Sequence, residues 1–210
     1  MEIKKTRVFS IVNQKGGVGK TTTAVNLATA LAAVGKSVLI VDFDPQGNAS
    51  TGLGIEQNNR EITSYEIVLD NVPVDKAIQK TAVPNLNIIP ATIDLSGAEV
   101  EMVSLVRREF RLQEALANTP QTYDYVLIDC PPSLGLLTLN ALTCSDAVLI
   151  PLQCEFYALE GLSHFVRTVE LVKNNINSKL DIQGIVLTMY DKRNKFTEQI
   201  EKDVRSFSEL

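Results

Sequence analysis

The segment 13–22 reads Asn-Gln-Lys-Gly-Gly-Val-Gly-Lys-Thr-Thr and combines flexible backbone with cationic and hydroxyl side chains. Glycines let a backbone approach an anion closely and turn its N–H groups inward. A helix-forming run begins at Lys20, so the positive end of that helix would face the same anion. Lys20 is suited to reach the β- and γ-phosphates of a nucleotide, and the Thr21 hydroxyl is suited to bind Mg²⁺. The segment therefore predicts a phosphate-binding loop for Mg-ATP.

An apolar run precedes this loop, and the order of strand, loop, Gly-Lys-Thr and helix is typical of nucleotide-binding loops. A glycine-rich loop taken alone is often only a tight turn, but this order makes the tight turn the weaker interpretation. The usual pattern has a glycine six positions before its final lysine. Here that position is Gln14, and the loop instead carries a second lysine, Lys15.

Acidic side chains close two of the apolar runs in the chain. The run 38–42 ends in Asp42 with Asp44 close behind, and the run 125–129 ends in Asp129. In parallel sheets ligands bind at the carboxyl ends of the strands, and a rigid carboxylate beside a phosphate loop can hold magnesium. Each acidic motif alone is about equally well explained as a helix N-cap or a turn. Together with the loop, they favour a nucleotide site.

Short β-branched runs alternate with longer stretches of helical period along the chain. The predicted strands are 8–12, 38–42, 86–90, 125–129, 147–151 and 182–188. The predicted helices are 20–34, 62–70, 105–118, 134–143 and 157–175, with a charged helical stretch from about Phe196. This alternation is typical of βαβ units, and strands with nearly continuous apolar residues are covered on both faces. We therefore expect an α/β fold, a doubly wound, mainly parallel sheet with helices on both faces.

Two local signals concern helix ends. Gly35 is well placed to cap the carboxyl end of the first helix. Ser96 and Glu99 have the spacing of a capping box that would open a short helix. A chance pairing of two common residues explains that spacing equally well, and the sequence leaves both interpretations open.

The composition excludes several classes of protein. Of the 210 residues, 45% are hydrophobic and 21% are charged, as in soluble globular proteins with a substantial core. The length fits one domain over 1–210. A net charge of −5 argues against a wholly basic nucleic-acid module. No apolar run is long enough to cross a bilayer, so we expect a cytoplasmic protein without a membrane partner.

The cysteines and the single histidine do not predict a metal site. Cys130, Cys144 and Cys154 are unequally spaced and form no C-x-x-C pair, which favours buried free thiols. His164 has no cysteine or carboxylate at ligand spacing. We interpret it as an ordinary helix residue.

With the loop and both acidic motifs considered together, the chain resembles the ParA/Soj chromosome-partitioning ATPases of the deviant Walker A class. The resemblance runs from the first strand to about residue 200, and its most specific segments are 15–22, 42–48, 128–135 and 151–161. It implies a P-loop NTPase fold, ATP and Mg²⁺ as cofactors, and slow, partner-stimulated hydrolysis of ATP to ADP and phosphate.

The resemblance also implies roles for single residues. Lys15 would cross a dimer interface to the partner subunit's ATP, and it forms the catalytic group with Lys20 and Asp44. Asp44 would orient the attacking water, with Asp42 beside it, and Gly16 would lie where the loops of two subunits meet. The nucleotide-binding residues implied are Lys15, Gly16, Gly17, Val18, Gly19, Lys20, Thr21, Thr22, Asp42, Asp129 and Pro131. The metal-binding residues implied are Thr21, Asp44 and Asp129.

Macromolecular partners follow from the same resemblance. They are a second copy of the chain in an ATP-bound homodimer, non-specific double-stranded DNA, and a ParB-type centromere-binding protein, which together imply a nucleoid-associated protein. Arg193, in the charged stretch 191–195, matches a DNA-contact position of the family. Such a cluster gives salt-sensitive binding to phosphates, although without the family match a solvated loop would be the better interpretation. Relatives continue with a further strand and closing helices, so we expect a truncated C-terminal edge.

Two other functions compete with partitioning. One is a small-molecule metabolic P-loop enzyme of the same fold, and the other is a truncated chain that binds nucleotide without cycling. The sequence carries no constellation for a small acceptor beyond the nucleotide site, and this favours the partitioning ATPase.

Overall fold

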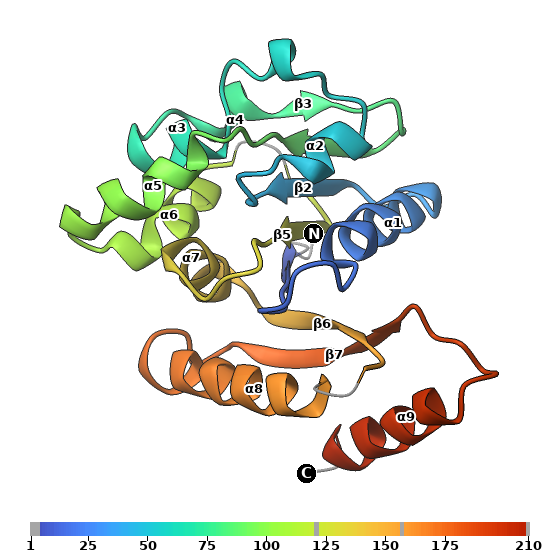
Figure 1. Ribbon diagram of the computed structural model, residues 1–210. Helices are drawn as coiled ribbons and strands as arrows, with labels where there is room; N and C mark the ends of the chain where they lie inside the picture. Colours follow the sequence, from blue (N-terminus) through green and yellow to red (C-terminus); the bar gives the residue numbers. More distant parts are fainter. Residues whose placement is uncertain (1–4, 120–121, 156–157, 209–210) are drawn as a thin grey trace.

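The structure, a computed structural model, describes residues 5–119, 122–155 and 158–208. Within these ranges seven strands form one sheet in the order β3-β4-β2-β5-β1-β6-β7 (Figure 1). Neighbouring strands are parallel except β3, which runs antiparallel to β4. The strands are β1 (Arg7–Ile11), β2 (Val38–Asp42), β3 (Gln79–Lys80), β4 (Leu86–Ile89), β5 (Tyr125–Asp129), β6 (Ala147–Gln153) and β7 (Asp181–Thr188).

Helices connect most of the strands. They are α1 (Lys20–Ala33), α2 (Asn48–Gly52), α3 (Ser64–Leu69), α4 (Val74–Ala77), α5 (Leu95–Glu101), α6 (Arg111–Ala117), α7 (Leu136–Cys144), α8 (Ala158–Asn175) and α9 (Lys195–Ser208). Short 3-10 helices cover Gln57–Asn59, Met102–Ser104 and Arg108–Phe110. No helix in the described part of the chain combines the length and hydrophobicity needed to span a membrane.

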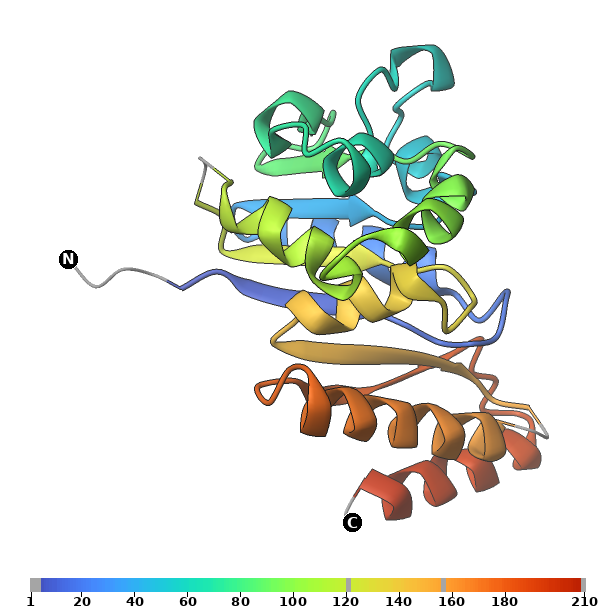
Figure 2. The same cartoon turned by 90° about the vertical axis from the view of Figure 1, so that its left-hand side faces the viewer.

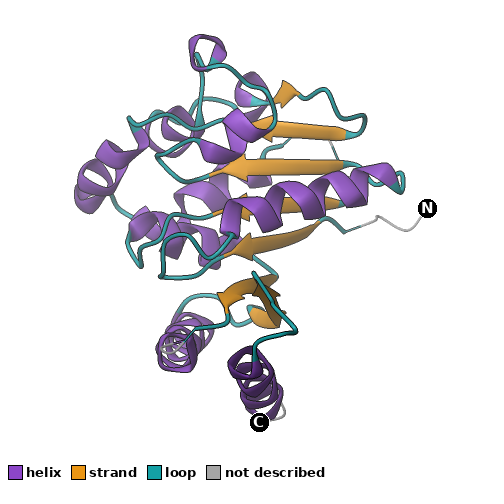
Figure 3. Ribbon diagram, turned by 45° about the vertical axis from the view of Figure 1, so that its right-hand side comes forward, coloured by secondary structure: helices purple, strands orange, loops and turns teal. Residues whose placement is uncertain are grey.

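The sheet separates two hydrophobic cores, because successive side chains of a strand point to opposite faces. All five residues of β2 are buried. Val38 and Ile40 belong to the core beneath α1 and α2, whereas Leu39 and Val41 belong to the core shared with α3 and α5 to α9. Figures 2 and 3 show helices on both sides of the sheet. The predicted doubly wound α/β fold is confirmed.

The predicted elements differ from the structure mainly in detail. β6 extends to Gln153, and the short elements α2, α4 and β3 were not predicted. The predicted helix 105–118 is divided, because Arg107 has a positive φ of 57° that interrupts it before the 3-10 helix. Tyr157, the first residue of the predicted helix 157–175, lies outside the described residues.

The two predictions for helix ends had opposite outcomes. Gly35 has a φ of +80° and ends α1, with its N–H donated to the Ala32 carbonyl at 3.0 Å. The capping-box interpretation of Ser96 is wrong: α5 begins at Leu95 without a side-chain cap, which leaves Ser96 inside the first turn. Glu99 instead accepts a hydrogen bond from the Leu137 N–H at 3.4 Å.

Within residues 5–119, 122–155 and 158–208, no group of three His, Cys, Asp or Glu side chains lies close enough together to hold a metal ion. All three cysteines are free; Cys130 is buried, whereas Cys144 and Cys154 are only partly buried, so the predicted burial is confirmed in full for Cys130 alone. Burial raises the pKa of Cys144 to about 12, so this thiol is unreactive near neutral pH. His164 lies in α8, as predicted, and its side chain is exposed.

Candidate nucleotide-binding site

The glycine loop joins the carboxyl end of β1 to the amino end of α1. Gly17 and Gly19 have φ values of +75° and +86°, a conformation that side chains of other residues disfavour. The Lys20 ammonium donates to the Lys15 carbonyl oxygen at 2.9 Å, so this side chain lies back across the loop. Lys20 is only 7% exposed, and burial lowers its pKa while Asp129 and Asp44 act in the opposite direction. The loop therefore presents backbone donors and one buried cation.

A cavity of about 350 Å³ opens beside this loop. It is lined by Gly16, Gly17, Gly19, Lys20, Thr21, Thr22, Asp44, Gln46, Asn48, Pro132 and Met189. Seven predicted site residues thus meet at one cavity, and Asp44 reaches it from the loop after β2. Val18 is instead part of the buried interior, and Pro131 is buried while its neighbour Pro132 lines the cavity.

Asp129 is the most unusual group near the loop. It ends β5, is fully buried, and neither carboxylate oxygen has a hydrogen-bond partner among the described residues. Burial raises its pKa to about 8; the Asp42 charge acts in the same direction, and the Thr21 hydroxyl and Lys20 act against it. Buried carboxylates are normally paired. An unpartnered one beside Thr21 and Lys20 fits a site for a cation or its bound water.

Asp42 lies opposite Asp129 in the neighbouring strand, yet its bonding differs. One carboxylate oxygen accepts the Ser50 N–H at 2.8 Å and the Ser50 hydroxyl at 2.6 Å. Burial raises its pKa to about 6, although the two bonds from Ser50 lower it. Asp42 does not line the cavity, so its visible role is to hold the start of α2 against β2.

Asp44 is held in a tight turn at the mouth of the cavity. Its carboxylate accepts the Gln46 N–H at 3.0 Å, and its carbonyl oxygen accepts the Gly47 N–H at 2.9 Å. Asp44 is 7% exposed, and Gly47 has a φ of +62°. The turn therefore fixes a carboxylate next to the phosphate loop.

Lys15 points away from the cavity that its own loop lines. Its ammonium forms an ion pair with Glu155, which follows β6, and its side chain remains 53% exposed. Glu155 lies in the segment 151–161 that carries the family resemblance, but no pattern in the sequence assigns it a role. In this structure Lys15 is thus held in place by its own chain.

A second cavity, of about 670 Å³, adjoins the first. Gly19, Thr22 and Met189 line both, and Leu27, Leu149 and Val186 make much of the second wall apolar. The Thr188 hydroxyl donates to the Val18 carbonyl oxygen at 2.8 Å, which ties the end of β7 to the glycine loop. The two cavities together offer a polar part and an apolar part, as a nucleotide requires.

Comparison with known proteins agrees with this geometry. A family model described as an AAA domain matches residues 6–182. The chromosome partitioning protein ParA of Caulobacter vibrioides strain NA1000 is 57% identical over 210 residues, which cover 98% of this chain and 78% of that protein. The chain belongs to the ParA/Soj family.

Two further proteins that are similar to this ParA/Soj chain carry other functional names. The sporulation initiation inhibitor protein Soj of Bacillus subtilis is 55% identical over 201 residues, covering 96% of this chain and 79% of Soj. The solved cobyrinic acid a,c-diamide synthase of Mycobacterium smegmatis, with bound ATP analog and magnesium, has a TM-score of 0.91. It is 40% identical and covers 96% of this chain and 82% of its own.

Arg193, the DNA-contact residue predicted from the ParA/Soj resemblance, lies in the loop between β7 and α9. Its guanidinium donates to both carboxylate oxygens of Asp191, at 2.9 and 2.8 Å, and its side chain is 91% exposed. Arg193 is therefore accessible to a polyanion, with its charge partly neutralised by a neighbour.

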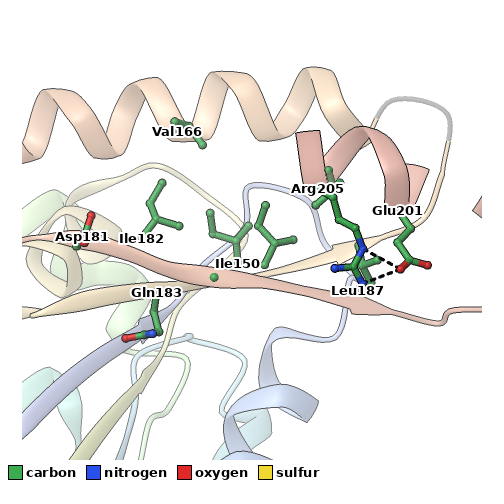
Figure 4. Close-up of a pocket in the computed structure, with 11 residues that line it drawn as sticks. Ile150, Val166, Asp181, Ile182, Gln183, Leu187, Glu201 and Arg205 are labelled. Atoms are coloured by element: carbon green, nitrogen blue, oxygen red, sulfur yellow. Dashed lines mark hydrogen bonds and ion pairs between the residues drawn. The ribbon is translucent and has the colours of Figure 1, made fainter. Parts of the chain in front are cut away.

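A cavity of about 710 Å³ lies away from the site, between β7, α8 and α9 of the ParA/Soj chain (Figure 4). Its walls are mainly branched apolar side chains, with the ion pair of Glu201 and Arg205 at one end. It contains none of the predicted site residues and no glycine loop, so it is not where the phosphates would bind.

Proposed function

We propose that this chain is a DNA-partitioning ATPase. ATP binding drives formation of a homodimer that binds double-stranded DNA non-specifically, and a ParB-type partner stimulates hydrolysis and release. The observation that carries the proposal is the unpartnered Asp129 carboxylate beside Thr21 and Lys20 at the glycine loop. The high identity to ParA and Soj supports the biological role.

The phosphates of ATP fit the cavity at the glycine loop. Backbone N–H groups and the start of α1 attract the anion, and Lys20 exchanges its bond with the Lys15 carbonyl for the β- and γ-phosphates. Thr21 and, through water, Asp129 would hold Mg²⁺, which neutralises charge on the phosphates. In the described part of the chain no cluster of three acidic, His or Cys residues could hold a metal alone. Phosphate oxygens therefore complete the magnesium site.

The adjoining apolar cavity fits the base of the nucleotide. Met189 lines both cavities, and Val186 and Leu149 provide apolar surface for a flat ring. ATP would then extend from the loop along the first turns of α1.

Hydrolysis in this proposal needs Asp44 and a second subunit. Asp44 orients the attacking water, and Lys15 of each subunit stabilises charge on the partner's ATP, as an arginine finger does. A side chain at Gly16 would meet nothing within 4 Å, so the outer surface of the loop is open to a facing loop. ATP held between two such loops would act as the link between the subunits.

The cycle of dimerisation and hydrolysis would control DNA binding. Arg193 contacts phosphates of nucleoid DNA in the cytoplasm, and hydrolysis releases the dimer from it. The ParB-type partner sets when this happens.

A second candidate is a small-molecule metabolic enzyme, favoured by the likeness to the Mycobacterium smegmatis synthase. A third is a chain that binds nucleotide without cycling. The synthase is less similar in sequence than ParA over nearly the same residues, 40% against 57%. This difference favours partitioning.

Size-exclusion chromatography with light scattering tests the proposal, with ADP or a non-hydrolysable ATP analogue, on the chain and on Lys20→Ala. We expect a dimer only with the ATP analogue and only with Lys20 intact. A monomer in every state that still binds ATP would support either the metabolic enzyme or the chain that binds nucleotide without cycling, and a screen for substrates would separate these two. Loss of nucleotide binding by the unmodified chain would overturn all three functions.

A further inference from the structure

Arg60 carries a buried charge without an acidic partner. It follows the 3-10 helix Gln57–Asn59 and is 7% exposed. Figure 1 shows the connection between α2 and α3 to which this 3-10 helix belongs. No described acidic side chain forms an ion pair with it. A buried guanidinium without a counter-ion destabilises a fold unless neutral acceptors surround it. The hydrogen-bond acceptors around Arg60 must therefore account for its burial.

Four oxygens from three segments surround this guanidinium. Nε and Nη2 donate to the Ile55 carbonyl at 3.1 and 2.7 Å, and Nη2 donates to the Thr51 hydroxyl at 2.8 Å. Nη1 donates to the carbonyl oxygens of Ala91 at 2.9 Å and Gly47 at 3.4 Å. Arginine can bind in this way because its planar fork presents five N–H groups. It thus joins the segment after β4 to both ends of α2.

The contact with Gly47 leaves no room for a side chain. A Cβ atom there would lie 2.8 Å from the Ala91 carbonyl oxygen and would also collide with the Arg60 guanidinium. Position 47 therefore requires glycine for two reasons: Arg60 approaches too closely for a side chain, and the turn has a positive φ.

The segment that Arg60 holds is the one that carries Asp44. Gly47 donates its N–H to the Asp44 carbonyl, and Asp44 and Gln46 line the phosphate cavity. Both backbone polar groups of Ala91 are bound, since its N–H donates to the Ser50 hydroxyl at 3.1 Å and its carbonyl accepts from Arg60. Through Gly47 and Ala91, Arg60 thus holds the segment that forms this wall of the phosphate cavity.

We propose that Arg60 is a positioning residue for ATP hydrolysis, which fixes the turn 44–48 so that Asp44 meets the attacking water. This inference rests on the proposed function. Arg60 lines neither nucleotide cavity, so it acts through the turn and leaves nucleotide affinity nearly unchanged. A displacement of about 1 Å in a reacting group can reduce a rate by about 100-fold.

Arg60→Lys keeps the charge and loses the fork. We expect kcat to fall by about tenfold or more, KM to change by less than about threefold, and the Gly47 and Ser50 amides to exchange hydrogen faster. Arg111→Lys is the matched control, because Arg111 also donates to backbone carbonyls, those of Val68 and Leu69, but lines neither nucleotide cavity. It should lower the melting temperature without changing kcat.

Thr51→Val keeps the test valid if Arg60→Lys does not fold. It removes one acceptor of the guanidinium, and we expect kcat to fall by about two- to threefold with faster exchange at Gly47. Unchanged kcat and exchange in a folded Arg60→Lys or Thr51→Val variant would overturn the inference. An equal loss of kcat in Arg111→Lys would overturn it too, by showing a general effect of stability. An unmodified chain that binds ATP but does not hydrolyse it would instead overturn the proposed function, and the catalytic role of Arg60 with it.

Discussion

Charged side chains have opposite environments at the centre of the sheet and at its β7 end: they are buried at the centre and exposed at the β7 end. At the centre, the buried Asp129 carboxylate has no hydrogen-bond partner, and the buried Arg60 has no acidic partner, among the described residues. At the other end, β7 is only partly covered, and the pairs Glu201–Arg205 and Asp191–Arg193 lie toward solvent. Exposed ion pairs contribute about 0–1 kcal/mol to stability, whereas buried unpaired charges oppose folding by several kcal/mol. Buried ionisable groups therefore gather around the nucleotide cavity, whereas the ion pairs at the β7 end are exposed and contain no predicted site residue of the glycine loop.

The largest expected effect is on stability, at Asp129. Because burial raises its pKa from 3.8 to about 8, the folded chain binds a proton in this pH window that the unfolded chain has released. The free energy of unfolding therefore falls as pH rises through the window. Asp129→Asn should remove this part of the decline and stabilise the chain at pH 8 by on the order of a few kcal/mol. Urea unfolding in magnesium-free buffer at several pH values measures it.

The control for this prediction comes from the other region. Asp181, at the start of β7, has a side chain 76% exposed beside Lys173. Asp181→Asn should leave the pH dependence of unfolding as it is in the unmodified chain. If Asp129→Asn behaves like Asp181→Asn, the contrast between the two regions is wrong.

The next largest effect is on hydrolysis, at Asp44. Asp44→Asn keeps the shape of the turn but weakens the orientation of the attacking water, so we expect kcat to fall by about 100-fold with little loss of ATP affinity. Steady-state hydrolysis and nucleotide titration measure the two quantities. Glu201→Gln, at the cavity of Figure 4, should change neither. A fall in affinity that matches the fall in kcat would show that Asp44 binds the nucleotide rather than orienting water.

Glu155 lies between the centre of the sheet and its β7 end, because it follows β6. Its ion pair holds Lys15 away from the nucleotide cavity. If Lys15 must leave Glu155 to reach a partner subunit, Glu155→Gln should favour the dimer with the ATP analogue. The ion pair is partly exposed, so a gain of up to about fivefold in dimer affinity is expected. Sedimentation equilibrium measures it, with Glu160→Gln in α8 as the exposed control. Weaker dimerisation in Glu155→Gln would mean that Glu155 belongs to the interface itself.

The features at the centre of the sheet that the sequence predicts correctly depend on residues that are close together in the chain. The glycines at 17 and 19 have the positive φ values that a phosphate loop needs, and the apolar runs before Asp42 and Asp129 are the buried strands β2 and β5. Both features are set by residues within a few positions of each other.

Contacts between distant segments could not be predicted from the sequence. Glu155 lies 140 positions from Lys15, and Arg60 lies 31 from Ala91, so no short-range pattern indicates either contact. The capping boxes make the same point, since Thr63 and Glu66 form one while Ser96 and Glu99, at equal spacing, do not. Glu99 is drawn instead to the Leu137 N–H of another element. Tertiary contacts decide such cases.

The smallest effect is expected at Arg193, where the charge is exposed and already paired with Asp191. Arg193→Ala should weaken DNA binding by the ATP-bound dimer a few-fold and reduce the slope of log K against log salt by about 1 per subunit. Asp191→Asn should strengthen binding, because it frees the guanidinium for phosphates. Fluorescence anisotropy over a salt series measures both, with Lys173→Ala in α8 as the control. If Lys173→Ala reduces the slope as much as Arg193→Ala, DNA binding depends on net charge alone, and the loop after β7 has no special place in it.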